Sequence, residues 1–166
     1  LEYHRGTYTT QARNKRANRK SEFLLHDAEF LSTAASLVDP EYQYPRQAFT
    51  EAWRTVCLNQ FHDIIPGSSI GPVYEESQGQ YAQLTESVTA LRNQALESLA
   101  GKLGGQLLLV NPTNFISTSA VFLPGGLPKG LAPRQGTKTL AVQEVEGGCL
   151  VAAAIMSPYS VTVLEL

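Results

Sequence analysis

The first hundred residues place apolar side chains at the spacing of an amphipathic helix. Neither glycine nor proline occurs between Gln11 and Ala35, and a helix can run without interruption there. Pro40 disfavours helical geometry in Asp39 and should stop it. The apolar positions recur at steps of four, three and four residues: Leu24, Ala28, Leu31 and Ala35. We therefore expect a first helix from about residue 11 to the Asp39-Pro40 pair.

The same pattern predicts two further helices. The second can begin around Pro45, because a first-turn proline loses no hydrogen bond there, and should end near Phe61. Cys57 falls in its apolar core pattern. The third begins near Gly71 and should be ended by Gly101, Gly104 and Gly105; its apolar positions are Tyr74, Tyr81, Leu84, Val88, Leu91 and Ala95. Three helices joined by short turns predict an antiparallel three-helix bundle over residues 1–104.

From Gln106 onward the apolar residues come in short runs, which are typical of β-strands. Glu146-Gly147-Gly148 is a hairpin turn that needs positive φ, and the proline-rich stretch Gly125–Gly136 should be a loop. The runs cover residues 107–110, 119–123, 141–145, 149–155 and 159–166. We expect a small antiparallel β-domain over residues 105–166 and an α+β fold for the whole chain.

Charge and hydropathy narrow the class of protein. The 166 residues carry 13 Lys and Arg against 15 Asp and Glu, a formal net charge of -2. That balance argues against nucleic-acid binding, which usually needs a basic surplus. The longest apolar runs, such as residues 106–110, are far too short to cross a bilayer, so we expect a soluble protein without a membrane span.

Two distant cysteines, Cys57 and Cys149, do not make a disulfide framework, and Pro112 removes the glycosylation acceptor at Asn111. Both observations fit a reducing compartment, and we expect a cytoplasmic protein. The sequence starts at Leu1 without a methionine or a signal segment. It therefore reads as a piece of a longer protein.

Residues 59–70 form the most unusual stretch of the sequence. They place His62 and Asp63 side by side where a helix gives way to a Pro-Gly loop. Imidazole and carboxylate are both competent zinc ligands, and either can hold a substrate hydroxyl. Zinc needs three or four ligands, however, and the two other imidazoles, His4 and His26, have no recognised spacing. The alternative is structural: His62 caps the carbonyls that end its helix, and Asp63 caps a group nearby.

Residues 1–20 carry six Lys and Arg against Glu2 alone. Five of them form the run Arg13, Lys15, Arg16, Arg19 and Lys20. A polyanion-binding surface is one interpretation. The other is a solvated face opposite the segment 21–70, which has seven acidic and two basic residues. The preceding segment, residues 2–10, could touch a sugar or phosphate, and Thr9 or Thr10 could equally cap the first helix.

These residues lead to a resemblance. The segments Glu2-Tyr3-His4-Arg5-Gly6-Thr7-Tyr8-Thr9-Thr10-Gln11 and Asn59-Gln60-Phe61-His62-Asp63-Ile64-Ile65-Pro66-Gly67-Ser68-Ser69 resemble class II α-mannosidases, glycoside hydrolase family 38. The second is close to a signature of the bacterial and cytosolic branch. A looser match, Val110-Asn111-Pro112 and then Pro158-Tyr159-Ser160, resembles the family's small β-domain.

The resemblance implies a retaining, exo-acting α-mannosidase that acts on terminal mannose of oligosaccharides with one zinc ion, held by two histidines and two aspartates. It implies that His62 is a zinc ligand and that Asp63 binds substrate hydroxyls. The other ligands, the nucleophile and the acid/base would lie in an N-terminal catalytic α/β domain that this sequence lacks, so the chain alone should be inactive.

Two alternatives to that reading differ in their ligand. The first is a noncatalytic carbohydrate-binding module on the β-half, which would bind sugar without zinc. The second is a polyanion-binding helical module that uses residues 13–20, and its affinity would fall steeply with salt.

Overall fold

The computed structural model describes residues 4–104, 107–152 and 155–166. Three helices come first in the chain and short antiparallel strands follow, which confirms the α+β class. Contacts divide the chain into two compact units, Leu1–Leu96 and Glu97–Leu166. The domain boundary expected at residues 104 and 105 stays a prediction, and Gly105 and Gln106 lie outside the described residues.

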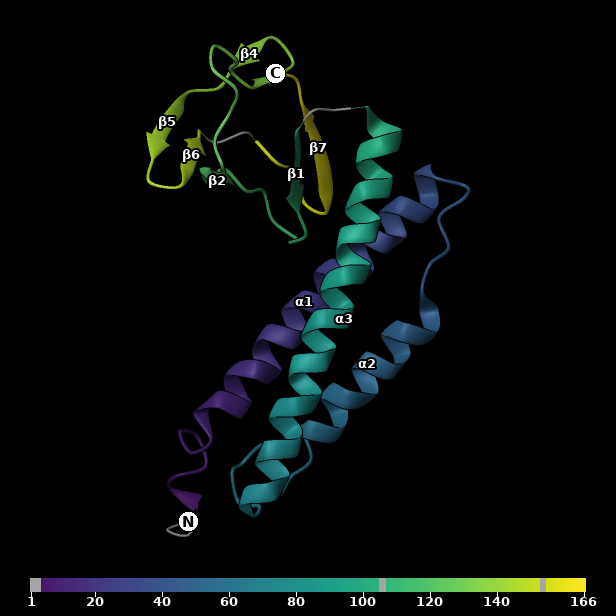
Figure 1. Ribbon diagram of the computed structural model, residues 1–166, viewed down its shortest axis with the longest axis vertical. Helices are drawn as coiled ribbons and strands as arrows, with labels where there is room; N and C mark the ends of the chain where they lie inside the picture. The colour runs from purple at the N-terminus through teal and green to yellow at the C-terminus, as the bar shows by residue number, and fades with distance from the viewer. Residues whose placement is uncertain (1–3, 105–106, 153–154) are drawn as a thin grey trace. The chain divides into compact units, whose positions relative to one another are not determined.

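The helices are α1 (Ala12–Val38), α2 (Arg46–Asn59) and α3 (Gly71–Leu103). Figure 1 shows α2 returning antiparallel to α1 and α3 running back beside both. Residue 11, in the left-handed region at φ 51°, precedes the first turn of α1 with no side-chain cap, so the expectation that Thr9 or Thr10 caps this helix is wrong. Gly101 lies inside α3, and Gly104 follows the helix end at φ 68°. An αL residue at that place is a common helix terminator.

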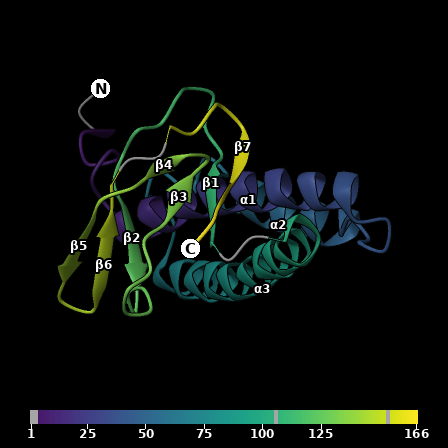
Figure 2. The ribbon, with the colours of Figure 1, turned by 90° about the horizontal axis from the view of Figure 1, so that it is seen from above.

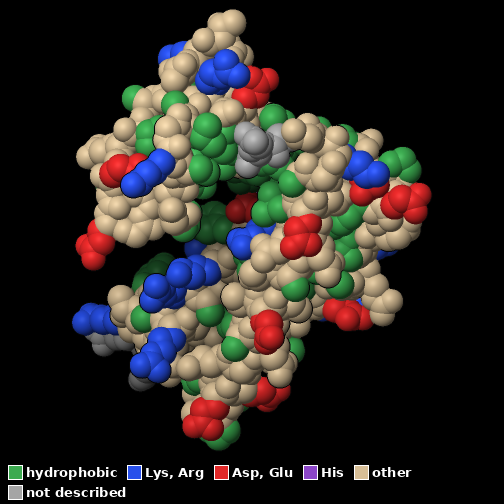
Figure 3. All heavy atoms as spheres, turned by 45° about the horizontal axis from the view of Figure 1, so that its top comes forward, with side chains coloured by type: hydrophobic (Ala, Val, Ile, Leu, Met, Phe, Trp, Pro, Cys, Tyr) green, Lys and Arg blue, Asp and Glu red, His purple; other side chains and the backbone are tan. Residues whose placement is uncertain are grey.

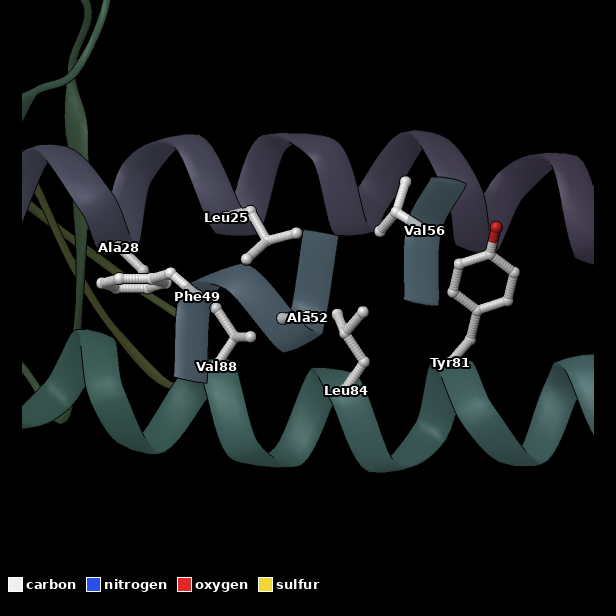
Figure 4. Close-up of a cluster of buried hydrophobic side chains, with 8 residues drawn as sticks. All are labelled: Leu25, Ala28, Phe49, Ala52, Val56, Tyr81, Leu84 and Val88. Carbon is white, nitrogen blue, oxygen red and sulfur yellow. The ribbon is translucent and has the colours of Figure 1, made fainter. Parts of the chain in front are cut away.

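Apolar side chains from all three helices form the core of the first unit (Figure 4). Leu25 is fully buried, whereas Leu24 is only partly buried and packs at the edge of the cluster. Burying one such side chain contributes about 1.5–3 kcal/mol. The buried members are Leu25, Ala28, Phe49, Ala52, Val56, Tyr81, Leu84 and Val88. Cys57 is exposed, so its expected place in the core is wrong: the buried face of α2 passes through Val56 instead.

The strands form three small antiparallel sheets. β1 (Leu107–Asn111) pairs with β7 (Ser160–Leu164), and Leu109 lies opposite Thr162. β6 (Gly148–Val151) lies between β2 (Val121–Pro124) and β5 (Val142–Val145), as Figure 2 shows. The hairpin turn at residues 146–148 is confirmed. The predicted run 149–155 includes residues 153–154, which lie outside the described part of the chain.

A third sheet was not expected. β3 (Arg134–Gln135) and β4 (Lys138–Thr139) form a hairpin whose strands have two residues each. The end of the predicted loop 125–136 is therefore a strand. The main-chain N–H of Arg134 also donates to the carbonyl of Glu165 at 2.7 Å, which ties this hairpin to the end of the chain. A separate apolar cluster holds the unit together, with Leu109, Leu140, Cys149, Val151, Met156 and Leu164 buried in it.

Asn111 is the polar centre of this second unit. Its side chain is 2% exposed, and its Nδ2 group donates to the carbonyls of Phe115 (2.8 Å), Met156 (3.3 Å) and Ser157 (2.9 Å). Its Oδ1 atom accepts from the main-chain N–H of Thr113 at 3.1 Å and from its hydroxyl at 2.6 Å. The Asn111 side chain therefore joins the end of β1 to two connecting segments. One lies between β1 and β2 and contains Phe115, and the other lies between β6 and β7 and contains Met156 and Ser157.

In the part of the chain that the structure describes, every helix is too short or too polar to cross a bilayer.

Candidate functional site

The segment after α2 folds into consecutive tight turns. The main-chain N–H of Gln60 closes the helix onto the carbonyls of Val56 (3.0 Å) and Cys57 (3.2 Å). Next, the Ile64 and Ile65 N–H groups donate to the carbonyl of Phe61 at 2.8 and 3.1 Å. The Gly67 N–H then donates to the carbonyl of Ile64 at 3.0 Å. We refer to residues 60–69 as the His62 loop.

His62 and Asp63 both project from this loop into solvent. Their side chains are 76% and 63% exposed, and His62 Nε2 lies 3.6 Å from Asp63 Oδ2, which is beyond hydrogen-bond distance. The Phe61 ring lies beside the imidazole, with 4.1 Å between ring centroids. Among the described residues, no carbonyl of α2 accepts a hydrogen bond from His62. The structure thus gives no support to the helix-capping interpretation, and the imidazole and the carboxylate are both exposed to solvent.

The donor atoms at this site match part of a zinc coordination sphere. Imidazole nitrogen and carboxylate oxygen are ordinary zinc ligands, and a zinc site takes three or four protein ligands. The described residues contain no cluster of three His, Cys, Asp or Glu side chains that could hold a metal. His26 pairs with Asp27 at 3.2 Å on α1 and is not part of the His62 loop. Within the described ranges, His62 and Asp63 therefore fit part of a metal site and not a complete one.

Lys15 of α1 anchors the His62 loop. Its ammonium donates to the carbonyl of Ile65 at 2.8 Å and to the carbonyl of Thr10 at 2.6 Å. Burial lowers the pKa of this lysine below its ordinary value. Charge-assisted hydrogen bonds of this kind are stronger than neutral ones. One side chain thus joins the loop to the segment that precedes α1.

Tyr74 of α3 holds the same loop from another side. Its hydroxyl accepts from the Ser69 N–H at 3.0 Å and donates to the carbonyl of Ile64 at 3.3 Å. The tyrosine is buried, so both contacts lie at the inner side of the loop. His62 and Asp63 are therefore exposed side chains on a loop whose backbone is hydrogen-bonded to side chains of α1 and α3.

A polar network continues from the loop into the bundle. The Gln60 side-chain amide donates to Asn18 Oδ1 at 3.0 Å and to Glu22 Oε1 at 2.9 Å. The Tyr81 hydroxyl donates to the same Asn18 oxygen at 3.2 Å. Burial, followed by the nearby charge of Glu22, raises the pKa of Tyr81 to about 12. The network thus runs from the exposed Gln60 through partly buried Asn18 to the buried Tyr81.

Sequence reasoning missed this network, although a signal for it exists. Asn14, Asn18 and Ser21 continue the stripe of Leu25 and Ala28 toward the start of α1 at steps of four, three, four and three. Asn14 is 1% exposed, and Ser77 of α3 donates to its Oδ1 at 2.5 Å. Polar residues that keep the period of an apolar stripe are thus an indication of a buried hydrogen-bonded contact.

Residues 4–11 form turns that pack on the His62 loop. The Thr10 N–H donates to the carbonyl of Gly6 at 2.8 Å. Gly67 has φ 89°, and a Cβ atom there would overlap the methyl group of Thr10. His4 and Arg5 are exposed, while residues 1–3 lie outside the described part of the chain. The two segments that carry the sequence resemblance are therefore in contact.

The basic run is only partly a solvent-exposed face. Lys and Arg side chains gather at the lower left of the face shown in Figure 3, and Arg13, Arg16, Arg19 and Lys20 are exposed. Arg19 pairs with Glu22 at 2.8 Å and lies over the Phe23 ring. Lys15 is half-buried and bonded to two carbonyls. Two of the five cations thus have partners inside the chain.

Comparisons with known proteins give the family. The family described as the α-mannosidase middle domain matches residues 2–99. Human α-mannosidase 2C1 is 41% identical over 130 residues, which are 76% of this chain and 12% of that protein. The α-mannosidase of Saccharomyces cerevisiae is 38% identical over 110 residues, 65% of this chain and 10% of that protein.

Two solved structures share the fold. An α-mannosidase from Enterococcus faecalis superposes with a TM-score of 0.75 at 17% identity, over 96% of this chain and 24% of that one. A glycosyl hydrolase family 38 protein from the same species gives 0.70 at 18% identity, over 96% and 25%.

The chain belongs to the class II α-mannosidases, glycoside hydrolase family 38, and residues 2–99 correspond to the family's middle domain. It spans about an eighth of the length of the human relative, since it covers 12% of that protein.

Proposed function

We propose that this chain is the metal-completing middle piece of a zinc-dependent, retaining exo-α-mannosidase that hydrolyses terminal α-linked mannose of oligosaccharides in the cytoplasm. The family assignment and the exposed His62–Asp63 pair on an anchored loop support the proposal. His62 supplies one zinc ligand, and Asp63 accepts hydrogen bonds from substrate hydroxyls.

The chemistry of the reaction explains which residues this chain contributes and which come from the rest of the enzyme. A retaining glycosidase needs two carboxyl groups about 5 Å apart, a nucleophile and an acid/base. In the enzyme that we propose, both belong to an N-terminal catalytic domain, with the remaining zinc ligands. Zinc, when bound, holds substrate hydroxyls and orients the sugar ring. The part played by this chain is to present an imidazole nitrogen and a carboxylate from a loop whose backbone is hydrogen-bonded to Lys15 and Tyr74.

The first test compares the intact enzyme with its His62→Ala variant for zinc content and aryl α-mannoside hydrolysis. We expect zinc to be lost and turnover to fall by roughly 100-fold or more. His26→Ala is the matched control, because His26 also pairs with a neighbouring aspartate but lies on the middle of α1; it should leave both unchanged. Zinc content that is indifferent to His62 would show that this histidine is not a ligand.

A second test uses the chain alone. Because it lacks three ligands and both catalytic carboxyls, it should bind zinc weakly and leave aryl α-mannosides intact. Mannose binding that persists in His62→Ala would instead favour the carbohydrate-binding module. Retention on heparin that falls steeply with salt would favour the polyanion-binding module.

A further inference from the structure

Lys15 differs from the rest of the basic run in its surroundings. The other four cations are exposed, whereas Lys15 is half-buried and its ammonium sits between two main-chain carbonyls, those of Thr10 and Ile65. Burying an ammonium group is unfavourable unless hydrogen bonds compensate it. The side chain is therefore held in place by the two segments that it joins.

Those two segments also touch directly. The Thr10 methyl group packs against Gly67, where a side chain would not fit. Lys15 and Gly67 thus hold residues 4–11 against the His62 loop, and Ile65 lies only three residues beyond His62 in the loop. On the other side of His62, Gln60 is fixed by Asn18 and Glu22. Lys15, Asn18 and Glu22, which make these polar contacts, all lie in the first three turns of α1.

We propose that Lys15 is a positioning residue, which fixes the backbone of the His62 loop so that His62 and Asp63 meet the metal and the substrate in one orientation. The inference rests on the proposed function. Lys15 touches neither the metal nor the substrate; it acts through the carbonyls of Thr10 and Ile65. A lysine suits this place because one compact ammonium can donate to two carbonyls at once, whereas a guanidinium spreads its donors over a plane.

The test on the chain itself measures amide hydrogen exchange of the His62 loop. Lys15→Met keeps the length of the side chain and removes the donor. We expect the amides of Ile64, Ile65 and Gly67 to exchange about tenfold faster, because their turns lose the anchor. Lys20→Met is the matched control, since Lys20 is an exposed cation of the same helix, and it should exchange like the wild type.

Lys15→Arg is the second variant and keeps the charge if Lys15→Met does not fold. Because the guanidinium cannot place one nitrogen between both carbonyls, the loop should exchange at a rate between those of the wild type and Lys15→Met. Wild-type exchange in Lys15→Met, or in Lys15→Arg where the first variant does not fold, would overturn the proposal.

The test on the intact enzyme separates positioning from general stability. We expect Lys15→Met to release zinc to a chelator about tenfold faster and to lower kcat with little change in KM. Lys15→Arg should recover part of both losses. In a His62→Ala background the Lys15 substitution should not change zinc retention further.

These outcomes keep the two proposals apart. If His62→Ala retains zinc, the proposed function fails, whatever Lys15 does. If His62→Ala loses zinc but Lys15→Met retains it with wild-type kcat, only the positioning role of Lys15 is refuted.

Discussion

The Trp53 indole N–H donates to Glu29 Oε2 at 3.0 Å, so one hydrogen bond ties α2 to the middle of α1. Tyr44, from the connection between these helices, lines the same pocket as Glu29 and Trp53. Burial, then the Glu29 charge, raises the pKa of the Tyr44 hydroxyl. Glu29 therefore binds the Trp53 side chain at the edge of the apolar core, and its charge lies near the Tyr44 hydroxyl.

Replacing Glu29 with alanine should destabilise the helical unit by about 2 kcal/mol, because the Trp53 indole N–H loses a charged acceptor. Trp53 is the only tryptophan in the sequence, so its fluorescence during urea unfolding reports on the helical unit. Glu86→Ala, at an exposed position of α3, is the control and should cost less than about 0.5 kcal/mol. Equal midpoints for the two variants would refute the role given to Glu29.

Two glycines should respond to alanine in opposite directions. Gly67→Ala should cost about 2–3 kcal/mol, because φ 89° strains an L-residue and the new methyl group meets that of Thr10. Gly79→Ala, in the exposed interior of α3 with open space around it, should stabilise by about 0.5–1 kcal/mol. Thermal unfolding followed by circular dichroism measures both.

The Gly67 variant has an internal check. Thr10→Ser removes the methyl group that the new Cβ would meet, so the double variant should regain the steric part of the loss and keep the backbone strain. A double variant no more stable than Gly67→Ala would show that this contact does not limit the site.

Alkaline pH should lower the free energy of unfolding of the helical unit, because the Tyr81 hydroxyl ionises. Its pKa is about 12 in the folded chain and near 10 when unfolded, so the folded state favours the neutral phenol. The stabilising effect is complete below pH 10 and is lost as the pH rises toward 12. Urea unfolding of the wild type should therefore show a falling midpoint across that window.

Tyr81→Phe is the matching variant and should show a flatter dependence on pH between 10 and 12. At pH 7 it should be less stable by about 1 kcal/mol, through the lost hydrogen bond to Asn18. The absorbance change of tyrosinate near the alkaline limit provides a direct reading: one late-titrating group should disappear in the variant. Identical slopes in the two proteins would contradict the assignment.

Asn111 offers a test in the second unit. Asn111→Asp places carboxylate oxygen against the three carbonyls that now accept from Nδ2, so it should destabilise more than Asn111→Ala, which we expect to cost about 2–4 kcal/mol. Amide exchange of β1 and β7 measures the effect. Thr118→Ala is a suitable control at a surface position. An aspartate variant as stable as the wild type would overturn this account.

The helices could be predicted from the sequence because burial of an apolar stripe determines them. The period of Ala28, Leu31 and Ala35 appears directly in the structure. The detail that failed was local: Leu24 and Leu25 are adjacent, and the packing of α2 and α3 decides which of them faces inward. The β3–β4 hairpin escaped because a two-residue strand has no period to detect.

The site could be found only in part. His62 and Asp63 stand out as a polar pair beside a Pro-Gly turn, whereas Lys15 is one cation among five and nothing in the spacing singles it out. Its partners are main-chain carbonyls, which every residue has, so no side-chain pattern marks the contact. The role of Lys15 depends on which carbonyls the fold brings near it.

The bundle changes character along its length, from apolar contacts at Leu25 and Val88 to amide and hydroxyl contacts at Asn14, Asn18 and Ser77. Exposing apolar surface raises the heat capacity of unfolding, whereas exposing polar surface lowers it. Hydrophobic contacts also weaken on cooling. The two ends of the bundle therefore differ in their response to temperature. Cold should loosen the apolar part first, while the end that carries the His62 loop keeps its shape.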